Sequence, residues 1–303
     1  MHASTNFSGA LAYPTLATMR APVILAAALF WAATSAHGQP AQPVSLAPSP
    51  PAAVPPAAAD AENAPPDDAI PVPPVPPRIA TGDQYDRCMD MLADDPAGAD
   101  ALATGWHTGG DAATHCHALA QVELGNPAAG AALLLTLATS PQSDAATRAE
   151  ILGQAAQALT MAGDAPHALD AATQAIALAP EDPDLRVIHA TTALAAQQPK
   201  EADDDLSLAL ATDPNRGDAL ILRATARRQL GRLADARVDI EKALANDPEN
   251  PDALLERGII RQRLGDLAGA KLDWQQTVDV APDSPTGDLA EQNLALLDAG
   301  PRQ

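Results

Sequence analysis

Four prolines recur at an interval of 34 residues in the C-terminal half of the chain, and this period constrains the fold more than any other feature. They are Pro180, Pro214, Pro248 and Pro282. Twelve residues before each proline lies an alanine: Ala168, Ala202, Ala236 and Ala270. Seventeen residues before each proline lie Gly163, Gln197, Gly231 and Gly265. A fixed period that keeps small residues at one phase is typical of a stacked helical repeat.

One period has room for two helices, as residues 217–250 show. Apolar residues at helical spacing, including Leu220 and Ala224, continue as far as Gly231, where glycine favours a helix end. A second apolar stretch ends before Pro248, because the residue preceding a proline is disfavoured in a helix. The alanines at constant phase mark places where two helices cross closely. Each period therefore predicts an antiparallel helix pair, and stacked pairs bury a continuous core that one pair cannot.

These residues resemble the tetratricopeptide repeat over residues 149–284. The small residue that the family has in its first helix corresponds to Ala156, Ala190, Ala224 and Gly258. The large residue eight before the proline corresponds to Ala172, Leu206, Ile240 and Trp274. The chain departs from the family in its shortage of aromatic residues, since the usual Trp and Tyr places hold Leu, Arg or Ala. The resemblance implies an all-α, right-handed superhelical array (a solenoid) of antiparallel helix pairs, with repeats at 149–182, 183–216, 217–250 and 251–284.

The segments on either side of these repeats have helical patterns of their own. We interpret residues 81–147 as degenerate helical-hairpin repeats that cap one end of the array. Residues 285–299 are expected to form an extra helix that covers the exposed face of the last repeat.

The N-terminal 38 residues resemble an export signal. Arg20 precedes an apolar run at residues 21–33, and small residues at 34–38 offer a cleavage site. We expect the residues before Met19 to be an upstream start that is not used. This interpretation predicts a periplasmic or secreted protein. The alternative is an uncleaved membrane anchor, although a membrane-spanning helix needs ~20 apolar residues.

Residues 39–80 are rich in proline and alanine and predict a disordered, extended linker. Fourteen prolines lie between residues 40 and 77, a composition that favours an extended chain over a packed core. The segment is either a stalk that offers a proline-rich ligand or a solvated linker with no ligand of its own.

The charge of the chain argues against a nucleic-acid partner. The formal net charge is −21, and the chain has only three lysines, whereas phosphate contacts need clustered Lys and Arg. The simplest meaning of the negative charge is a soluble, self-repelling surface.

The only two cysteines, Cys88 and Cys116, both follow the predicted signal. An even cysteine count in an exported protein indicates a disulfide, and two buried free thiols are the alternative. His115 and His117 flank Cys116, but histidines two residues apart on a helix point to different faces. Because metal-binding pairs such as Cys-x-x-Cys or His-x-x-x-His are missing from the sequence, we predict no metal and no cofactor.

Charged residues also keep the repeat's phase. Arg223 and Arg257 each precede an aspartate by sixteen residues, Asp239 and Asp273 respectively. His189 precedes Asp205 by the same spacing, whereas the first repeat has Ala155 and Ala171 at the two phases. The pattern resembles a bacterial variant of the family in which Arg on the first helix pairs with Asp on the second. It implies structural ion pairs, which fix register more than they stabilise.

Four further arginines lie on two adjacent first helices: Arg227, Arg228, Arg261 and Arg263. In the family these helices line the concave face, so a basic stripe there would attract an acidic peptide or a C-terminal carboxylate. The apolar contacts would come from Ile221, Leu255 and Ile259. The family's carboxylate clamp is missing, since its places hold residues such as Asp184, Asp218 and Asp252. The alternative is that the four arginines are solvated or ion-paired.

The sequence contains no nucleophile elbow, P-loop or His-Glu-x-x-His motif. We therefore predict a non-enzymatic scaffold that binds a protein or peptide partner on the concave face of the array. A purely structural spacer or an oligomerising array is the first alternative. An enzyme that uses Cys88 and Cys116 in thiol or metal chemistry is the second.

Overall fold

The computed structural model describes residues 77–299, and all regular secondary structure in this part of the chain is helical. The helices are α1 (Asp83–Met91), α2 (Pro96–Gly105), α3 (Gly110–Glu123), α4 (Pro127–Leu137), α5 (Ala145–Met161), α6 (Ala165–Leu178), α7 (Pro183–Ala195), α8 (Pro199–Thr212), α9 (Gly217–Gln229), α10 (Leu233–Asn246), α11 (Pro251–Arg263), α12 (Leu267–Val280) and α13 (Pro285–Ala299). None of these helices is both long and apolar enough to cross a membrane. The predicted signal and the linker as far as residue 76 lie outside the described residues.

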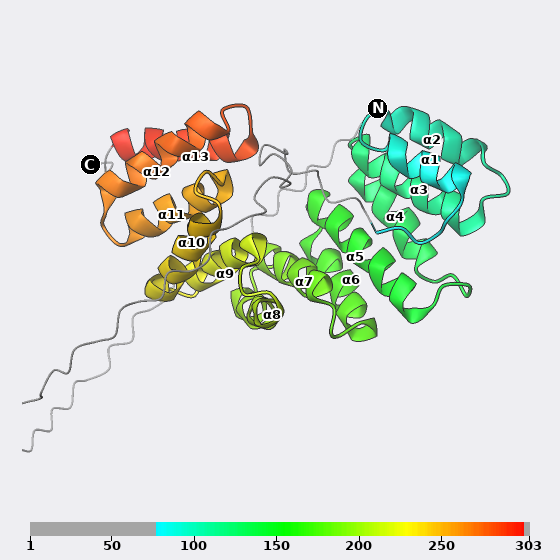
Figure 1. The fold of residues 1–303 in the computed structure, drawn as a ribbon, viewed down its shortest axis with the longest axis horizontal. Coiled ribbons are helices and arrows are strands. Elements are labelled where there is room, and N and C mark those ends of the chain that lie inside the picture. Colours follow the sequence, from blue (N-terminus) through cyan, green and yellow to red (C-terminus); the bar gives the residue numbers. More distant parts are fainter. Residues whose placement is uncertain (1–76, 300–303) are drawn as a thin grey trace, which may run out of the picture. The chain divides into compact units, whose positions relative to one another are not determined.

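The helices pack in chain order as pairs (Figure 1). Within the 34-residue repeats, α5 packs against α6, α7 against α8, α9 against α10 and α11 against α12. Each pair also contacts the next one, and α13 packs against α12 and α11. The prediction of an all-α solenoid of helix pairs is confirmed.

The recurring prolines end the second helix of each pair. Each follows the residue that caps that helix, and the four capping residues are Ala179, Asp213, Asp247 and Ala281. Their φ angles are −136°, −125°, −139° and −143°, which lie outside the helical region as expected before proline. The chain must therefore turn at the same phase in every repeat.

The turn inside each pair needs a left-handed residue. Gly163, Gly231 and Gly265 have φ angles of 76°, 77° and 88°, a conformation that glycine adopts without steric cost. Gln197 has the same role in the second repeat, with φ at 61°, and is the only non-glycine residue with positive φ in residues 77–299. The left-handed conformation that all four repeats share at this phase explains why three of them have glycine there.

Small residues mark the closest helix contacts. The alanines twelve residues before the prolines are completely buried in all four repeats. At the first-helix phase, Gly258 replaces the alanine of the other repeats because a Cβ there would lie 2.3 Å from Trp274 Nε1. The last repeat thus combines the largest residue at one phase with the smallest at the other.

The N-terminal helices are joined by a disulfide between Cys88 on α1 and Cys116 on α3, with 6.3 Å between the Cα atoms. Beside it, the buried ring of His115 is held from both sides. Its Nδ1 lies 2.8 Å from the Tyr85 hydroxyl and its Nε2 lies 2.6 Å from Gln154 Oε1. Burial lowers the pKa of His115, and the hydrogen bond to Gln154 opposes this only in part. The ring is therefore a neutral part of the core that links α1, α3 and α5.

Candidate binding groove

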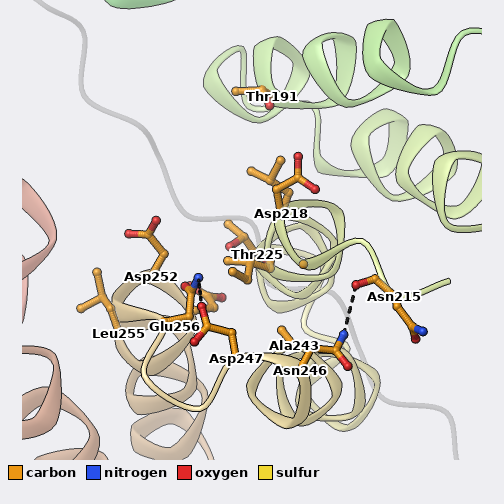
Figure 2. Close-up of a pocket in the computed structure, with 14 residues that line it drawn as sticks. Thr191, Asn215, Asp218, Thr225, Ala243, Asn246, Asp247, Asp252, Leu255 and Glu256 are labelled. Atoms are coloured by element: carbon orange, nitrogen blue, oxygen red, sulfur yellow. Dashed lines mark hydrogen bonds between the residues drawn. The ribbon is translucent and has the colours of Figure 1, made fainter. Parts of the chain in front are cut away.

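First helices of adjacent repeats line a groove with a cavity of about 740 Å³ (Figure 2). Most of the lining comes from α9 and α11, and further residues come from α7, α10 and the connecting turns. The lining residues are Thr191, Asn215, Gly217, Asp218, Ile221, Leu222, Thr225, Ala243, Asn246, Asp247, Asn250, Asp252, Leu255 and Glu256.

Helical spacing brings the lining residues of α9 to one face. Asp218, Ile221 and Thr225 follow one another at intervals of three and four residues, so their side chains lie one above the other. Asp252 and Leu255 repeat the first two positions one period later, on α11. The groove therefore follows from the repeat itself, because both α9 and α11 have an apolar residue three positions after an aspartate.

The predicted apolar contacts divide in the structure. Ile221 and Leu255 line the groove. Ile259 does not line the groove, and both Ile259 and Leu255 pack against the C-terminal core cluster of Ala270, Trp274 and Ala290. A ligand in the groove would thus find Ile221 and Leu255 directly.

The groove lining is acidic, with four carboxylates and no Lys, Arg or His. Asp218 accepts two hydrogen bonds from Arg216, of 2.8 and 3.0 Å. Glu256 is buried and accepts a 2.5 Å hydrogen bond from Arg228 Nε. Burial raises the pKa of Glu256 and the contact with Arg228 opposes that rise.

Two of these carboxylates have no cationic partner among the described residues. Asp252 accepts a 2.6 Å hydrogen bond from the Thr286 hydroxyl, and Asp247 accepts one of 3.2 Å from the Asn250 amide. Neither contact neutralises the charge, so the groove keeps a negative potential.

The arginine–aspartate phases meet as the sequence indicates. Arg223 donates to both oxygens of Asp239 at 2.9 and 2.7 Å, and Arg257 donates to both oxygens of Asp273 at 3.0 and 2.7 Å. In the repeat before them, His189 Nδ1 lies 2.6 Å from Asp205 Oδ2. Each contact joins the first and second helix of one repeat.

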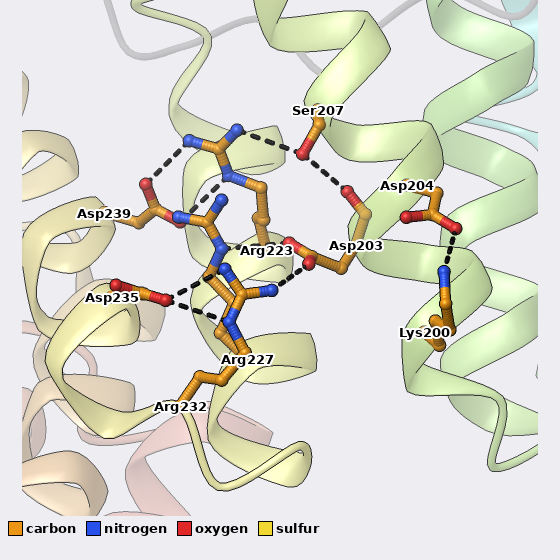
Figure 3. Close-up of polar contacts among 9 residues, drawn as sticks. All are labelled: Lys200, Asp203, Asp204, Ser207, Arg223, Arg227, Arg232, Asp235 and Asp239. Carbon is orange, nitrogen blue, oxygen red and sulfur yellow. Dashed lines mark hydrogen bonds and ion pairs between the residues drawn. The ribbon is translucent and has the colours of Figure 1, made fainter.

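The four arginines predicted to contact a peptide lie in different surroundings. Arg227 donates to Asp203 at 2.9 Å and to Asp239 at 2.7 Å (Figure 3). Arg261 donates to Asp273 at 2.7 Å. These contacts favour the ion-paired alternative for both residues.

The remaining two of these arginines differ from each other. Arg228 pairs with Glu256 beside the groove, whereas Arg263 is exposed and donates a 3.5 Å hydrogen bond to the Arg228 carbonyl. A peptide-contacting role for the four residues stays a prediction.

Sequence reasoning missed the second arginine on each aspartate. Arg227 and Arg261 follow Arg223 and Arg257 by four residues, which places each pair on one helix face. That spacing was available in the sequence, and it indicates that one carboxylate can accept from both arginines. Asp203 completes the network by joining Arg227 and Arg232, with 2.5 Å to Arg232 Nη1 (Figure 3).

In the part of the chain that the structure describes, both cysteines and the histidines beside Cys116 are engaged in contacts with other residues. Both sulfur atoms are joined in the disulfide, and both ring nitrogens of His115 are hydrogen-bonded. His117 Nδ1 lies 2.6 Å from Asp100. Within residues 77–299, no group of three or more His, Cys, Asp or Glu side chains is placed to hold a metal ion.

Solved structures with a similar fold are tetratricopeptide repeat proteins. TTC0263, a thermophilic TPR protein of Thermus thermophilus, is 17% identical with a TM-score of 0.52, and the match covers 61% of this chain and 100% of TTC0263. A chain of the APC/C hetero-tetramer Cut9–Hcn1 is 14% identical with a TM-score of 0.57, over 70% of this chain and 42% of that one. The sequence matches no protein-family model and no curated protein.

Proposed function

Because the chain has the tetratricopeptide repeat fold, we propose that it is a non-enzymatic scaffold that holds a segment of a partner protein in the groove along its first helices. The observation that carries this proposal is the groove itself. It places Ile221 and Leu255 at one phase of successive repeats, where both are half-buried and line the groove. Apolar side chains in a depression of this kind supply binding free energy when a partner covers them.

Export to the periplasm is part of the same proposal. The apolar segment after Arg20 and the disulfide between Cys88 and Cys116 both support it, since disulfides persist in oxidising compartments. Expression with and without residues 1–38, followed by fractionation of the cells, tests this part separately from binding.

The test of the scaffold compares two double variants in a capture experiment from extracts of the native host. Ile221→Arg/Leu255→Arg fills the groove with two charged side chains. Val238→Arg/Leu272→Arg is the matched control, because these residues are also one period apart but are 62% and 67% exposed on second helices. Circular dichroism shows whether both variants fold.

The proposal predicts that the groove variant loses partners that the wild type and the control variant retain. A partner recovered in this way is then purified and its affinity for the three proteins is measured by calorimetry. Equal affinities would contradict binding in the groove and favour the alternative of a structural spacer.

A further inference from the structure

The groove has a second, apolar depression next to the acidic one. Its cavity of about 250 Å³ lies between α5 and α7 and is lined by Gln157, Thr160, Met161, Val187, Ile188, Thr191 and Thr192. Thr191 lines both depressions, so the two adjoin at α7. Met161 is a large, exposed apolar side chain, and methionine adapts its shape to different apolar ligands.

The two depressions differ in charge. The apolar one contains no ionisable side chain, whereas the other has Asp247 and Asp252, the two carboxylates that lack a cationic partner among the described residues. A segment that fits both must present apolar side chains to one depression. It must present apolar and positively charged side chains to the other, because an acidic segment would be repelled there.

The length of the occupant follows from the row of first helices. Contacts run from α5 to α7, from α7 to α9 and from α9 to α11. Three helix spacings of ~9 Å correspond to roughly eight residues of extended chain at ~3.3 Å each.

We infer that the partner segment is an extended peptide of roughly eight residues, with apolar residues toward one end and Lys or Arg toward the other. This inference rests on the proposed function. Asp247 and Asp252, which lack a cationic partner among the described residues, would bind its cationic groups. The chain's own linker does not fit, because residues 39–76 carry four acidic residues and no Lys or Arg. A second copy is disfavoured in the same way, since the net charge of each chain is −21.

The experiment selects random nonapeptides displayed on phage against the immobilised full-length chain. The inference predicts enrichment of peptides that combine Leu, Ile or Phe with Lys or Arg. The most enriched peptide is then synthesised, and its affinity is measured for the wild type and for Asp247→Asn/Asp252→Asn. Asparagine keeps the size and an acceptor oxygen while removing the charge.

The matched control is Asp170→Asn/Asp279→Asn, which removes two exposed charges on second helices away from both depressions. The double Asp→Asn variant of the groove carboxylates should weaken binding by about tenfold or more, and the control should change it less than twofold. Higher ionic strength should weaken binding to the wild type more than binding to this carboxylate variant.

Two other outcomes are distinguishable. Enriched peptides that are acidic or uncharged, or that bind all variants equally but not Ile221→Arg/Leu255→Arg, would overturn the basic partner and leave the scaffold proposal standing. Failure to enrich any peptide, or enrichment that Ile221→Arg/Leu255→Arg does not affect, would count against both.

Discussion

Replacement of Asp239 by alanine tests the energetic role of the arginine–aspartate network. The Asp239 side chain is only 4% exposed and accepts three hydrogen bonds of 2.7–2.9 Å from Arg223 and Arg227, which are 17% and 15% exposed. Removing one partner of a buried ion pair costs ~3–5 kcal/mol because the other charge stays buried. Since both arginines keep some contact with solvent and Arg227 keeps Asp203, we expect a loss of about 3 kcal/mol in the free energy of unfolding.

The first repeat shows how the lost stability can be recovered. At the three phases of Arg223, Arg227 and Asp239 it has Ala155, Leu159 and Ala171, which are all buried. Replacing a buried ionic set by apolar residues is often neutral. The triple variant Arg223→Ala/Arg227→Leu/Asp239→Ala should therefore unfold within about 1 kcal/mol of the wild type, although it changes two more residues than Asp239→Ala.

Urea denaturation followed by circular dichroism measures these differences. Glu241→Ala is the control, because its pair with Arg237 is exposed and 3.5 Å long, and such pairs contribute less than ~1 kcal/mol. The reasoning is refuted if Asp239→Ala costs no more than Glu241→Ala, or if the triple variant is less stable than Asp239→Ala.

Four further changes have expected outcomes. Gly258→Ala should cost ~1–3 kcal/mol through the clash with Trp274, and Gly258→Ala/Trp274→Ile, which copies the third repeat, should restore most of it in the same urea assay. Gln197→Gly should raise stability by ~0.5–1 kcal/mol, because it relieves a left-handed backbone; an unchanged or lower urea midpoint contradicts this. Reduction of the disulfide between Cys88 and Cys116 should lower the free energy of unfolding by ~3–4 kcal/mol for a sequence separation of 28 residues. A melting temperature that reductant does not change would contradict this prediction. The pKa of His115 is lowered in the folded state, so the free energy of unfolding should fall as the pH drops below the ordinary histidine value of ~6.5. The fall should be at most ~1.4 kcal/mol per pH unit, and His115→Gln should flatten this slope between pH 6.5 and 5.

The helix pairs could be predicted because their signals are local. A proline excludes helix at the residue before it, and a left-handed turn favours glycine, so the period alone locates every turn of α5–α12. The sixteen-residue spacing of Arg223 and Asp239 was equally visible, since two other repeats contain it or a histidine version of it.

The acidity of the groove could not be predicted in the same way. Asp218 and Asp252 recur at one phase, but Asp247 comes from a turn and Glu256 from a buried position on α11. These side chains come together only because of the way neighbouring repeats pack, and that packing geometry could not be predicted from the sequence. The same holds for Arg228, whose partner Glu256 lies 28 residues away on α11.

The most direct test of binding in the groove is site-specific photo-crosslinking in the native host. A benzophenone amino acid placed at Thr191, where the two depressions meet, should yield a covalent adduct with a partner protein. The same amino acid at Val238, on the exposed side of α10, should yield none. An adduct from Val238 but not from Thr191 would contradict the account, because the partner would then bind the second helices.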